Sequence, residues 1–225
     1  MSYDGVAQVL WAQGRTPRRG PRPRVSLDGI VAAAVRVADA EGLEAASMQR
    51  VAAEVGVTKM ALYRHVPGKA ELVALMVDRT LGEPPATGDG PWRARLAAWA
   101  QAMRDGFAAH RWLLAAAVGP RVFGPNELGW LEAGLAALDG LPLGPAERLD
   151  SLVLVGSHVR ALVQQATEPA TERALALALA DVLASRADAY PLAAAAFAGA
   201  AGRDDAFAFG LERVLDGIEA LVASR

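Results

Sequence analysis

The sequence predicts an all-α protein with one small and one larger helical domain. The chain is rich in alanine, and it shows no run of alternating apolar and polar residues of the kind that forms a half-buried strand. Apolar residues recur instead at three- and four-residue spacing between glycine and proline stops. A length of 225 residues allows a small domain followed by a larger one.

Residues 1–25 are expected to form a flexible basic arm. The run GRTPRRGPRPR holds three prolines, which oppose helix formation, and five arginines, which leave little to bury. An alternative for residues 3–13 is a short amphipathic helix, whose docking place the sequence does not indicate.

Two short helices joined by a tight turn are predicted at residues 47–66. Ser47 is a suitable N-cap for the first helix, and Thr58 is a suitable N-cap for the second. Gly56 tolerates the left-handed backbone that the turn between them requires. Pro67 ends the second helix, because proline disfavours helical conformation in the residue before it. The segment is a helix–turn–helix.

The domain boundary is predicted at the Pro/Gly-rich stretch GEPPATGDGP, between residues 26–82 and residues 91–225. In the first part, a helix over 26–42 supports the helix–turn–helix, and a fourth helix covers 69–81. The helices expected in the second part cover about 92–109, 111–118, 126–139, 146–166, 170–186 and 204–223.

The net charge of −2 hides an asymmetry between the two parts of the chain. Residues 1–81 carry 11 Lys and Arg against 8 Asp and Glu, whereas residues 82–225 carry 12 against 17. A positive charge confined to the part that holds the helix–turn–helix is what nucleic-acid binding requires.

The run SMQRVAAEVGVTKMALYRHVPGK resembles the tetracycline-repressor family of bacterial transcription regulators. The diagnostic motif of that family, a glycine turn followed by x-x-x-x-L-Y-x-H-V/F-x-x-K, stands here as Gly56, Leu62, Tyr63, His65, Val66 and Lys69. The similarity covers about residues 26–81 and returns in the last helix, AFAFGLERVLDGIEALVA. It implies a three-helix DNA-binding domain followed by a helical ligand-binding and dimerisation domain.

The resemblance also implies which residues contact double-stranded operator DNA. Base contacts are expected from Gln49, Lys59, Met60 and Ala61, since a glutamine amide reads adenine and a lysine donates to guanine. Contacts to the phosphate backbone are expected from Ser47, Thr58, Tyr63, His65 and Lys69. Alternative roles are partial core packing for Tyr63, helix capping for His65 and the covering of apolar surface for Met60.

Three arginines complete the expected DNA contacts. Arg64 lies on the outward arc of the second helix. Arg22 and Arg24, the part of the arm nearest the folded domain, are expected to enter the minor groove or bind phosphate. The alternative for the arm is a solubilising tail.

The C-terminal domain is expected to bind a small organic effector. Four of the five tryptophans follow residue 82, and apolar pockets between bundle helices are common ligand sites. Polar residues within apolar runs are costly to bury unless they are paired, which makes them candidates for ligand hydrogen bonds. The alternative is ordinary core packing or a structural hydrogen bond. The candidates are Trp99, Met103, Phe107, His110, Asn126, Trp130, Ser157, His158 and Leu162. The same cost of burying a polar residue applies to Arg160 and Gln164.

Several other classes of protein and site are excluded. With no cysteine and three histidines, none of them paired at helical spacing, we expect neither a metal site nor a cofactor. The tetracycline sensor of the family binds its drug with magnesium through a histidine just before a loop. The comparable stretch here, AAAVGPR, has none, which makes tetracycline itself doubtful as the effector. Catalytic and nucleotide-binding motifs are absent, so we do not expect an enzyme. The chain has no secretory signal and no membrane-length apolar run, so the expected location is the cytoplasm, without membrane contact.

The resulting hypothesis is a ligand-responsive transcriptional repressor. A long apolar stripe on the last helix predicts a core or a subunit interface, and the resemblance implies a homodimer through the C-terminal helices. A two-fold symmetric dimer requires a palindromic operator. The alternatives are an activator or co-regulator on the same fold, and a helical enzyme that binds a small molecule.

Overall fold

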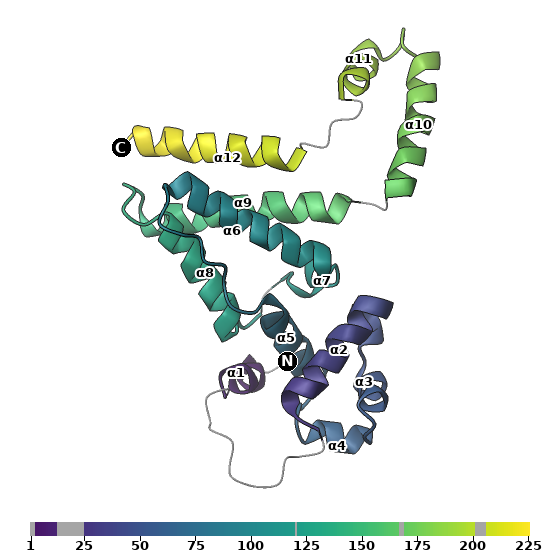
Figure 1. Ribbon diagram of the computed structural model, residues 1–225, viewed down its shortest axis with the longest axis vertical. Coiled ribbons are helices and arrows are strands. Elements are labelled where there is room, and N and C mark those ends of the chain that lie inside the picture. The colour runs from purple at the N-terminus through teal and green to yellow at the C-terminus, as the bar shows by residue number, and fades with distance from the viewer. Residues whose placement is uncertain (1–2, 13–24, 120, 167–168, 201–205) are drawn as a thin grey trace.

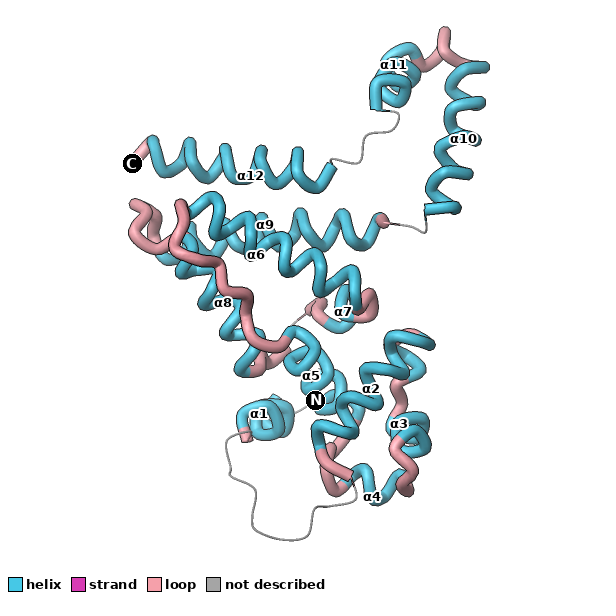
Figure 2. Tube along the Cα trace, in the orientation of Figure 1, coloured by secondary structure: helices cyan, strands magenta, loops and turns pink. Residues whose placement is uncertain are grey.

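The computed structural model describes residues 3–12, 25–119, 121–166, 169–200 and 206–225. Over these residues the chain forms helices and loops without any β-strand, as the sequence predicts (Figure 2). Figure 1 shows the helices and the short 3₁₀ turn η1, which are α1 (Tyr3–Trp11), α2 (Leu27–Glu41), η1 (Leu43–Ala45), α3 (Met48–Glu54), α4 (Lys59–Tyr63), α5 (Lys69–Leu81), α6 (Trp92–Ala109), α7 (Leu113–Ala116), α8 (Pro125–Ala137), α9 (Pro145–Gln165), α10 (Pro169–Ser185), α11 (Pro191–Ala200) and α12 (Ala206–Ala223).

The predicted helix–turn–helix is formed by α3 and α4. The Ser47 hydroxyl accepts a hydrogen bond from the N–H of Arg50, and the Thr58 hydroxyl accepts one from the N–H of Ala61, both at 3.2 Å. Each hydroxyl therefore caps its helix. Gly56 between the helices has a φ of +70°, in the left-handed region that strains other residues.

The recognition helix α4 is held in place by the core beneath it. Val51 of α3, Leu62 of α4 and Leu72 of α5 are fully buried in one apolar cluster. The support helix α2 begins at its predicted cap, Ser26, and packs against α3 and α5. Since α4 has only five residues, its position depends on this packing and not on its own helical stability.

Helix α5 belongs to both domains. It packs against α2 of the DNA-binding domain and against α7 and α8 of the C-terminal domain, and the loop 82–91 follows at the predicted boundary. Asp78 of α5 is fully buried, and its carboxylate accepts hydrogen bonds from the backbone N–H groups of Asn126 at 2.9 Å and Glu127 at 3.2 Å. A side chain of α5 thus caps the first turn of α8.

The body of the C-terminal domain consists of α6, α8, α9 and α12. Helix α9 packs against both α6 and α12, with Val155 and Val159 buried. Arg93, in the first turn of α6, ties that helix to α12 through ion pairs of 2.8 Å with Glu212, Asp216 and Glu219.

Helices α10 and α11 stand away from this body, at the upper right of Figure 1. The sequence predicts α10 but not α11, because PLAAAAFAGA is uniformly apolar and shows no helical period of apolar and polar residues. Their exposed large apolar side chains include Leu175, Leu177, Leu179, Val182, Leu192 and Phe197.

The structure differs from the expected flexible arm over residues 3–11, which form helix α1. This helix packs against α5, with Leu10 fully buried, and the indole N–H of Trp11 donates to the carbonyl of Phe123 at 3.1 Å. An amphipathic helix becomes stable when its apolar face finds a partner surface, which composition alone does not reveal. The remainder of the arm with Arg22 and Arg24, residues 13–24, lies outside the described residues.

Candidate DNA-binding surface and effector cavity

The face of α4 opposite buried Leu62 is exposed and carries a mixed set of side chains. Met60 is 71% exposed and Tyr63 is 38% exposed. The Lys59 ammonium lies 5.8 Å from the centroid of the Tyr63 ring, a cation–π contact that orients it. The face thus offers a hydrogen-bond donor for base edges, apolar surface for thymine methyls and a phenol for phosphate.

The other predicted DNA contacts surround this face. Gln49 of α3 and Arg64 and His65 after α4 are exposed, whereas Ala61 is half-buried. Thr58 is exposed and Ser47 is half-buried, each beside the N-terminus that it caps. A capping hydroxyl that accepts from the backbone still has its own hydrogen to donate to a phosphate.

Lys69 lies at the start of α5, where it forms an ion pair with Glu44, 3.0 Å between Nζ and Oε2. The lysine side chain is 41% exposed and the glutamate is 94% exposed. Such an exposed pair contributes little free energy, so a DNA phosphate can replace the carboxylate.

Arg50 positions the helix–turn–helix, a role that the sequence analysis missed. Its guanidinium binds Glu41 at the end of α2 and Glu54 on α3, both at 2.8 Å. These hydrogen bonds, the one to Glu41 first, raise the pKa of Arg50 above its ordinary value. The spacing of four residues to Glu54 is visible in the sequence, but the contact with Glu41 depends on the packing of α2 against α3.

A cavity of about 460 Å³ lies between α5, α6, α8 and α9. Five of the nine predicted ligand residues line it: Trp99, Met103, Phe107, Trp130 and Ser157. Arg160, which the sequence analysis also singled out as a polar residue that is costly to bury, lines it as well. The lining residues that the sequence analysis did not name include Val77, Leu81, Leu113, Arg121, Phe123, Glu127, Leu149, Leu152 and Val153. Most of these are ordinary apolar residues, which carry no signal that separates a cavity wall from a core.

The other four predicted ligand residues do not line this cavity. His110 lies 2.8 Å from the carboxylate of Asp39 on α2, and Asn126 hydrogen bonds with Asp78. His158 lies 3.0 Å from the carbonyl of Phe207 and stacks on its ring. Leu162 is half-buried on α9. A protein partner can satisfy the hydrogen bonds of a buried polar group as well as a ligand can. His110, Asn126 and His158 have such protein partners.

Helix α5 connects the cavity to the DNA-binding domain. Val77 and Leu81 of α5 form part of the cavity wall. The indole N–H of Trp130, which also lines the cavity, donates to the carbonyls of Leu81 at 3.2 Å and Gly82 at 3.1 Å. A molecule in the cavity would therefore touch the same helix that packs against α2, the support helix of the helix–turn–helix.

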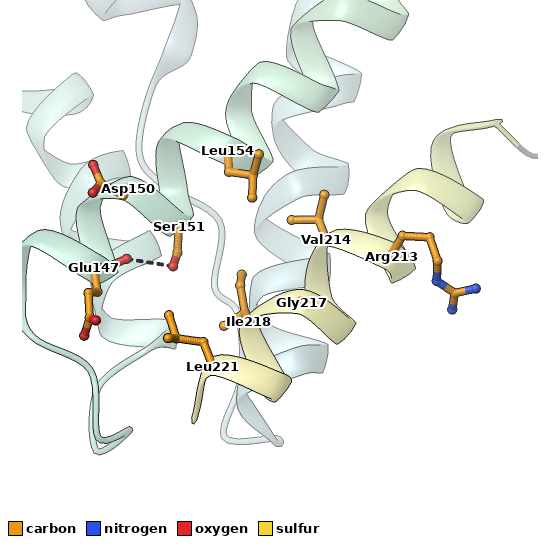
Figure 3. Close-up of a pocket in the computed structure, with 9 residues that line it drawn as sticks. All are labelled: Glu147, Asp150, Ser151, Leu154, Arg213, Val214, Gly217, Ile218 and Leu221. Carbon is orange, nitrogen blue, oxygen red and sulfur yellow. Dashed lines mark hydrogen bonds between the residues drawn. The ribbon is translucent and has the colours of Figure 1, made fainter. Parts of the chain in front are cut away.

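A second hollow is the open groove of about 490 Å³ between α9 and α12, shown in Figure 3. Its apolar floor comes from Leu154, Val214, Ile218 and Leu221, and its rim carries Glu147, Asp150, Ser151 and Arg213. The apolar stripe predicted on the last helix is divided here. Leu211, Leu215 and Ile218 are buried against the body, while Val214, Leu221 and Val222 are only partly buried.

Two negative findings apply to the part of the chain that the structure describes. None of its helices is long and apolar enough to cross a membrane. No three acidic, histidine or cysteine side chains come together there in a way that would hold a metal ion.

An exposed recognition helix, a supporting three-helix domain and a separate cavity define a helix–turn–helix transcription regulator. Residues 30–76 match the family described as "Bacterial regulatory proteins, tetR family", and residues 84–222 match "Tetracyclin repressor-like, C-terminal domain". The chain belongs to the tetR family, as the sequence motif indicates. It is a DNA-binding regulator and not an enzyme.

Several of the similar proteins are regulators from streptomycetes. The HTH-type transcriptional repressor DrrR1 of Streptomyces coeruleorubidus is 42% identical over 234 residues, which span 97% of this chain and 86% of the relative. Apo ActR from Streptomyces coelicolor superposes with a TM-score of 0.79 at 28% identity, covering 91% of this chain and 99% of ActR. ActR in complex with actinorhodin gives a TM-score of 0.77 at 30% identity, covering 90% and 99%.

Proposed function

We propose that this protein is a homodimeric repressor that binds a palindromic operator and leaves it when a small organic molecule enters the cavity. Its similarity to a named repressor and to a regulator whose structure holds actinorhodin supports both halves of the proposal. As a bacterial gene regulator it acts in the cytoplasm, where its operator lies.

The DNA-binding half rests on α4 and its surroundings. Lys59 and Met60 reach base edges in the major groove together with Gln49 of α3, while Tyr63 and Lys69 bind phosphates. Phosphate contacts set the register of the protein on the duplex, and base contacts select the sequence.

The dimer is formed by α9 and α12 of two copies. The groove between these helices exposes an apolar floor, and Leu154 on α9 and Phe209 on α12 are 52% and 60% exposed. Exposed apolar surface on two adjacent helices is what a four-helix interface between identical chains buries. The dimer then places two recognition helices at a fixed spacing, as a palindrome requires.

Release from DNA is explained by helix α5, which is shared by the cavity and the DNA-binding domain. This shared helix is the observation that carries the proposal. The cavity contacts α5 through Val77, Leu81 and the Trp130 hydrogen bonds, and α5 begins at Lys69 beside the recognition helix. A helix of 13 residues spans about 20 Å and moves as a rigid lever. A ligand that fits the cavity only after α5 has tilted shifts the population toward the form that cannot bind DNA.

A gel-shift series on the region upstream of neighbouring genes tests the function. We expect a sequence-specific shift that survives excess competitor DNA and is weakened in Lys59→Ala, but not in a control variant, Arg186→Ala, at an exposed position just after α10. Absence of any specific shift at moderate salt would contradict the proposal. Reporter expression in a deletion strain then separates repression from activation.

A further inference from the structure

The charged part of the cavity wall consists of two arginines and one glutamate. The guanidinium of Arg121 binds the Glu127 carboxylate, with Nε at 3.1 Å from Oε1, and it donates to the Ala117 carbonyl at 2.7 Å. The guanidinium of Arg160 donates to the same Ala117 carbonyl and to that of Leu114, both at 3.1 Å. Two cations thus converge on one carbonyl oxygen.

The charges of this group do not cancel. Glu127 balances Arg121, whereas Arg160 has neutral carbonyls as its partners, and no carboxylate of the described residues lies within ion-pair distance of it. Partial burial, with the repulsion of Arg121 added to it, lowers the pKa of Arg160 below its ordinary value. Its charge is therefore poorly compensated by the protein, since an arginine keeps its proton in any protein environment.

The remainder of the wall offers aromatic surface and few further donors. The indole N–H of Trp99 donates to the Trp130 carbonyl at 2.9 Å, and that of Trp130 is bound to the end of α5. Both indoles thus present only ring surface to the cavity. The Arg160 guanidinium lies over the Phe107 ring, 5.8 Å from the ring centroid, so the cation adjoins the aromatic surface of the cavity.

We propose that the effector of this cavity is an aromatic anion, whose carboxylate or ionised phenol binds Arg160 while its rings lie against Trp99, Phe107 and Trp130. Charge-assisted hydrogen bonds between guanidinium and carboxylate are among the strong ones, and they strengthen when water is excluded. The proposal rests on the proposed function, because it names the chemical class of ligand that the regulatory cavity takes.

A matched pair of probes tests the charge preference. Titration of the full-length protein with 2-naphthoate and with neutral 2-naphthamide at pH 7.4, followed by calorimetry, compares ligands of nearly the same shape. We expect the carboxylate to bind at least about tenfold more tightly than the amide, the factor that about 1.4 kcal/mol produces.

Substitutions assign the preference to Arg160. Arg160→Gln should abolish the preference and leave the affinity for the amide unchanged, while Arg160→Lys should retain part of it. Glu127→Gln should increase it, because that change removes the negative charge beside Arg121. Arg148→Gln is the matched control, since Arg148 lies on the same helix, is similarly buried and binds Asp139 outside the cavity.

Failure of the carboxylate to bind more tightly than the amide, whether both bind or neither does, overturns the proposal. So does a preference that survives in Arg160→Gln. A wild-type protein that shifts operator DNA in the gel yet shows no charge preference refutes the ligand class and leaves the repressor function standing. A protein that prefers the carboxylate but never shifts DNA refutes the repressor function instead.

Discussion

Asn126 donates hydrogen bonds to Asp78 across the domain boundary, from both its backbone and its side chain. The Asp78 carboxylate accepts from the Asn126 backbone N–H at 2.9 Å, and the Asn126 side-chain amide donates to the Asp78 carbonyl, also at 2.9 Å. The N–H groups of a first helical turn have no partner within their own helix, and the helix dipole favours a negative charge there. A buried carboxylate of α5 is therefore stable at this position, and it fixes α5 to the first turn of α8.

Asp78→Ala should lower the free energy of unfolding by about 2 kcal/mol, because it removes a buried charged acceptor and leaves N–H groups of α8 unpaired. Asp78→Asn should cost less, since the amide oxygen still accepts. Chemical denaturation of the wild type and both variants measures the difference. Glu132→Ala, at an exposed position of α8, serves as control. Equal effects of Asp78→Ala and the control would show that this link does not stabilise the fold.

Lys59→Ala and Lys69→Ala should affect DNA binding in different ways. Loss of Lys59, on the outward face of α4, should cost about 1–3 kcal/mol at the base pair it reads and relax the sequence preference there. Loss of Lys69 should weaken binding to all sequences alike and reduce the slope of log K against log salt concentration by about 1. Competition assays with single-base operator variants distinguish the two. Identical behaviour of both variants would refute the division of roles.

Arg22→Ala combined with Arg24→Ala should weaken operator binding and flatten its salt dependence by up to about 2 in slope, because two phosphate contacts would be lost. This double change leaves α1 and its contacts on α5 intact, unlike deletion of the first 24 residues. Fluorescence anisotropy over a range of salt concentrations provides the slope. A slope equal to that of the wild type would contradict a DNA-binding role for these arginines.

Leu154→Asp should shift the protein from dimer to monomer and lower operator affinity more than tenfold. A charge in the apolar groove between α9 and α12 would be buried without a partner in the proposed interface. Sedimentation equilibrium measures the state of association. Leu128→Asp, at an exposed apolar position on α8 outside the groove, should remain dimeric. A dimeric Leu154→Asp protein would place the interface elsewhere.

The helix–turn–helix was predictable from sequence because its determinants are local. Ser47 and Thr58 cap the helices that follow them, and Gly56 takes the backbone conformation that only glycine adopts easily. The aromatic part of the cavity was predictable for a related reason, since Trp99 and Trp130 are large aromatic residues on helices that contain many alanines.

The parts that escaped prediction depend on contacts between distant segments. No local pattern reveals that α1 packs against α5, or that Asn126 is matched to Asp78 rather than to a ligand. Arg160 and His158 lie in the same apolar run and are candidates for the same reason, yet only Arg160 lines the cavity, while His158 pairs with Phe207. The helices around α9 decide which of its faces contacts solvent, which contacts the core and which lines the cavity.

Helix α5 is both a wall of the cavity and a part of the core of the DNA-binding domain. Substitutions that change ligand selectivity are therefore tolerated less well on α5 than on the other walls of the cavity. Substitutions at Val77 or Leu81 that suit a new compound also alter the support of the helix–turn–helix, and they should often produce uninducible or constitutive phenotypes. Substitutions on α6 and α9, at positions such as Met103 and Leu149, do not alter the support of the helix–turn–helix. A biosensor for new compounds is therefore best evolved from those two helices.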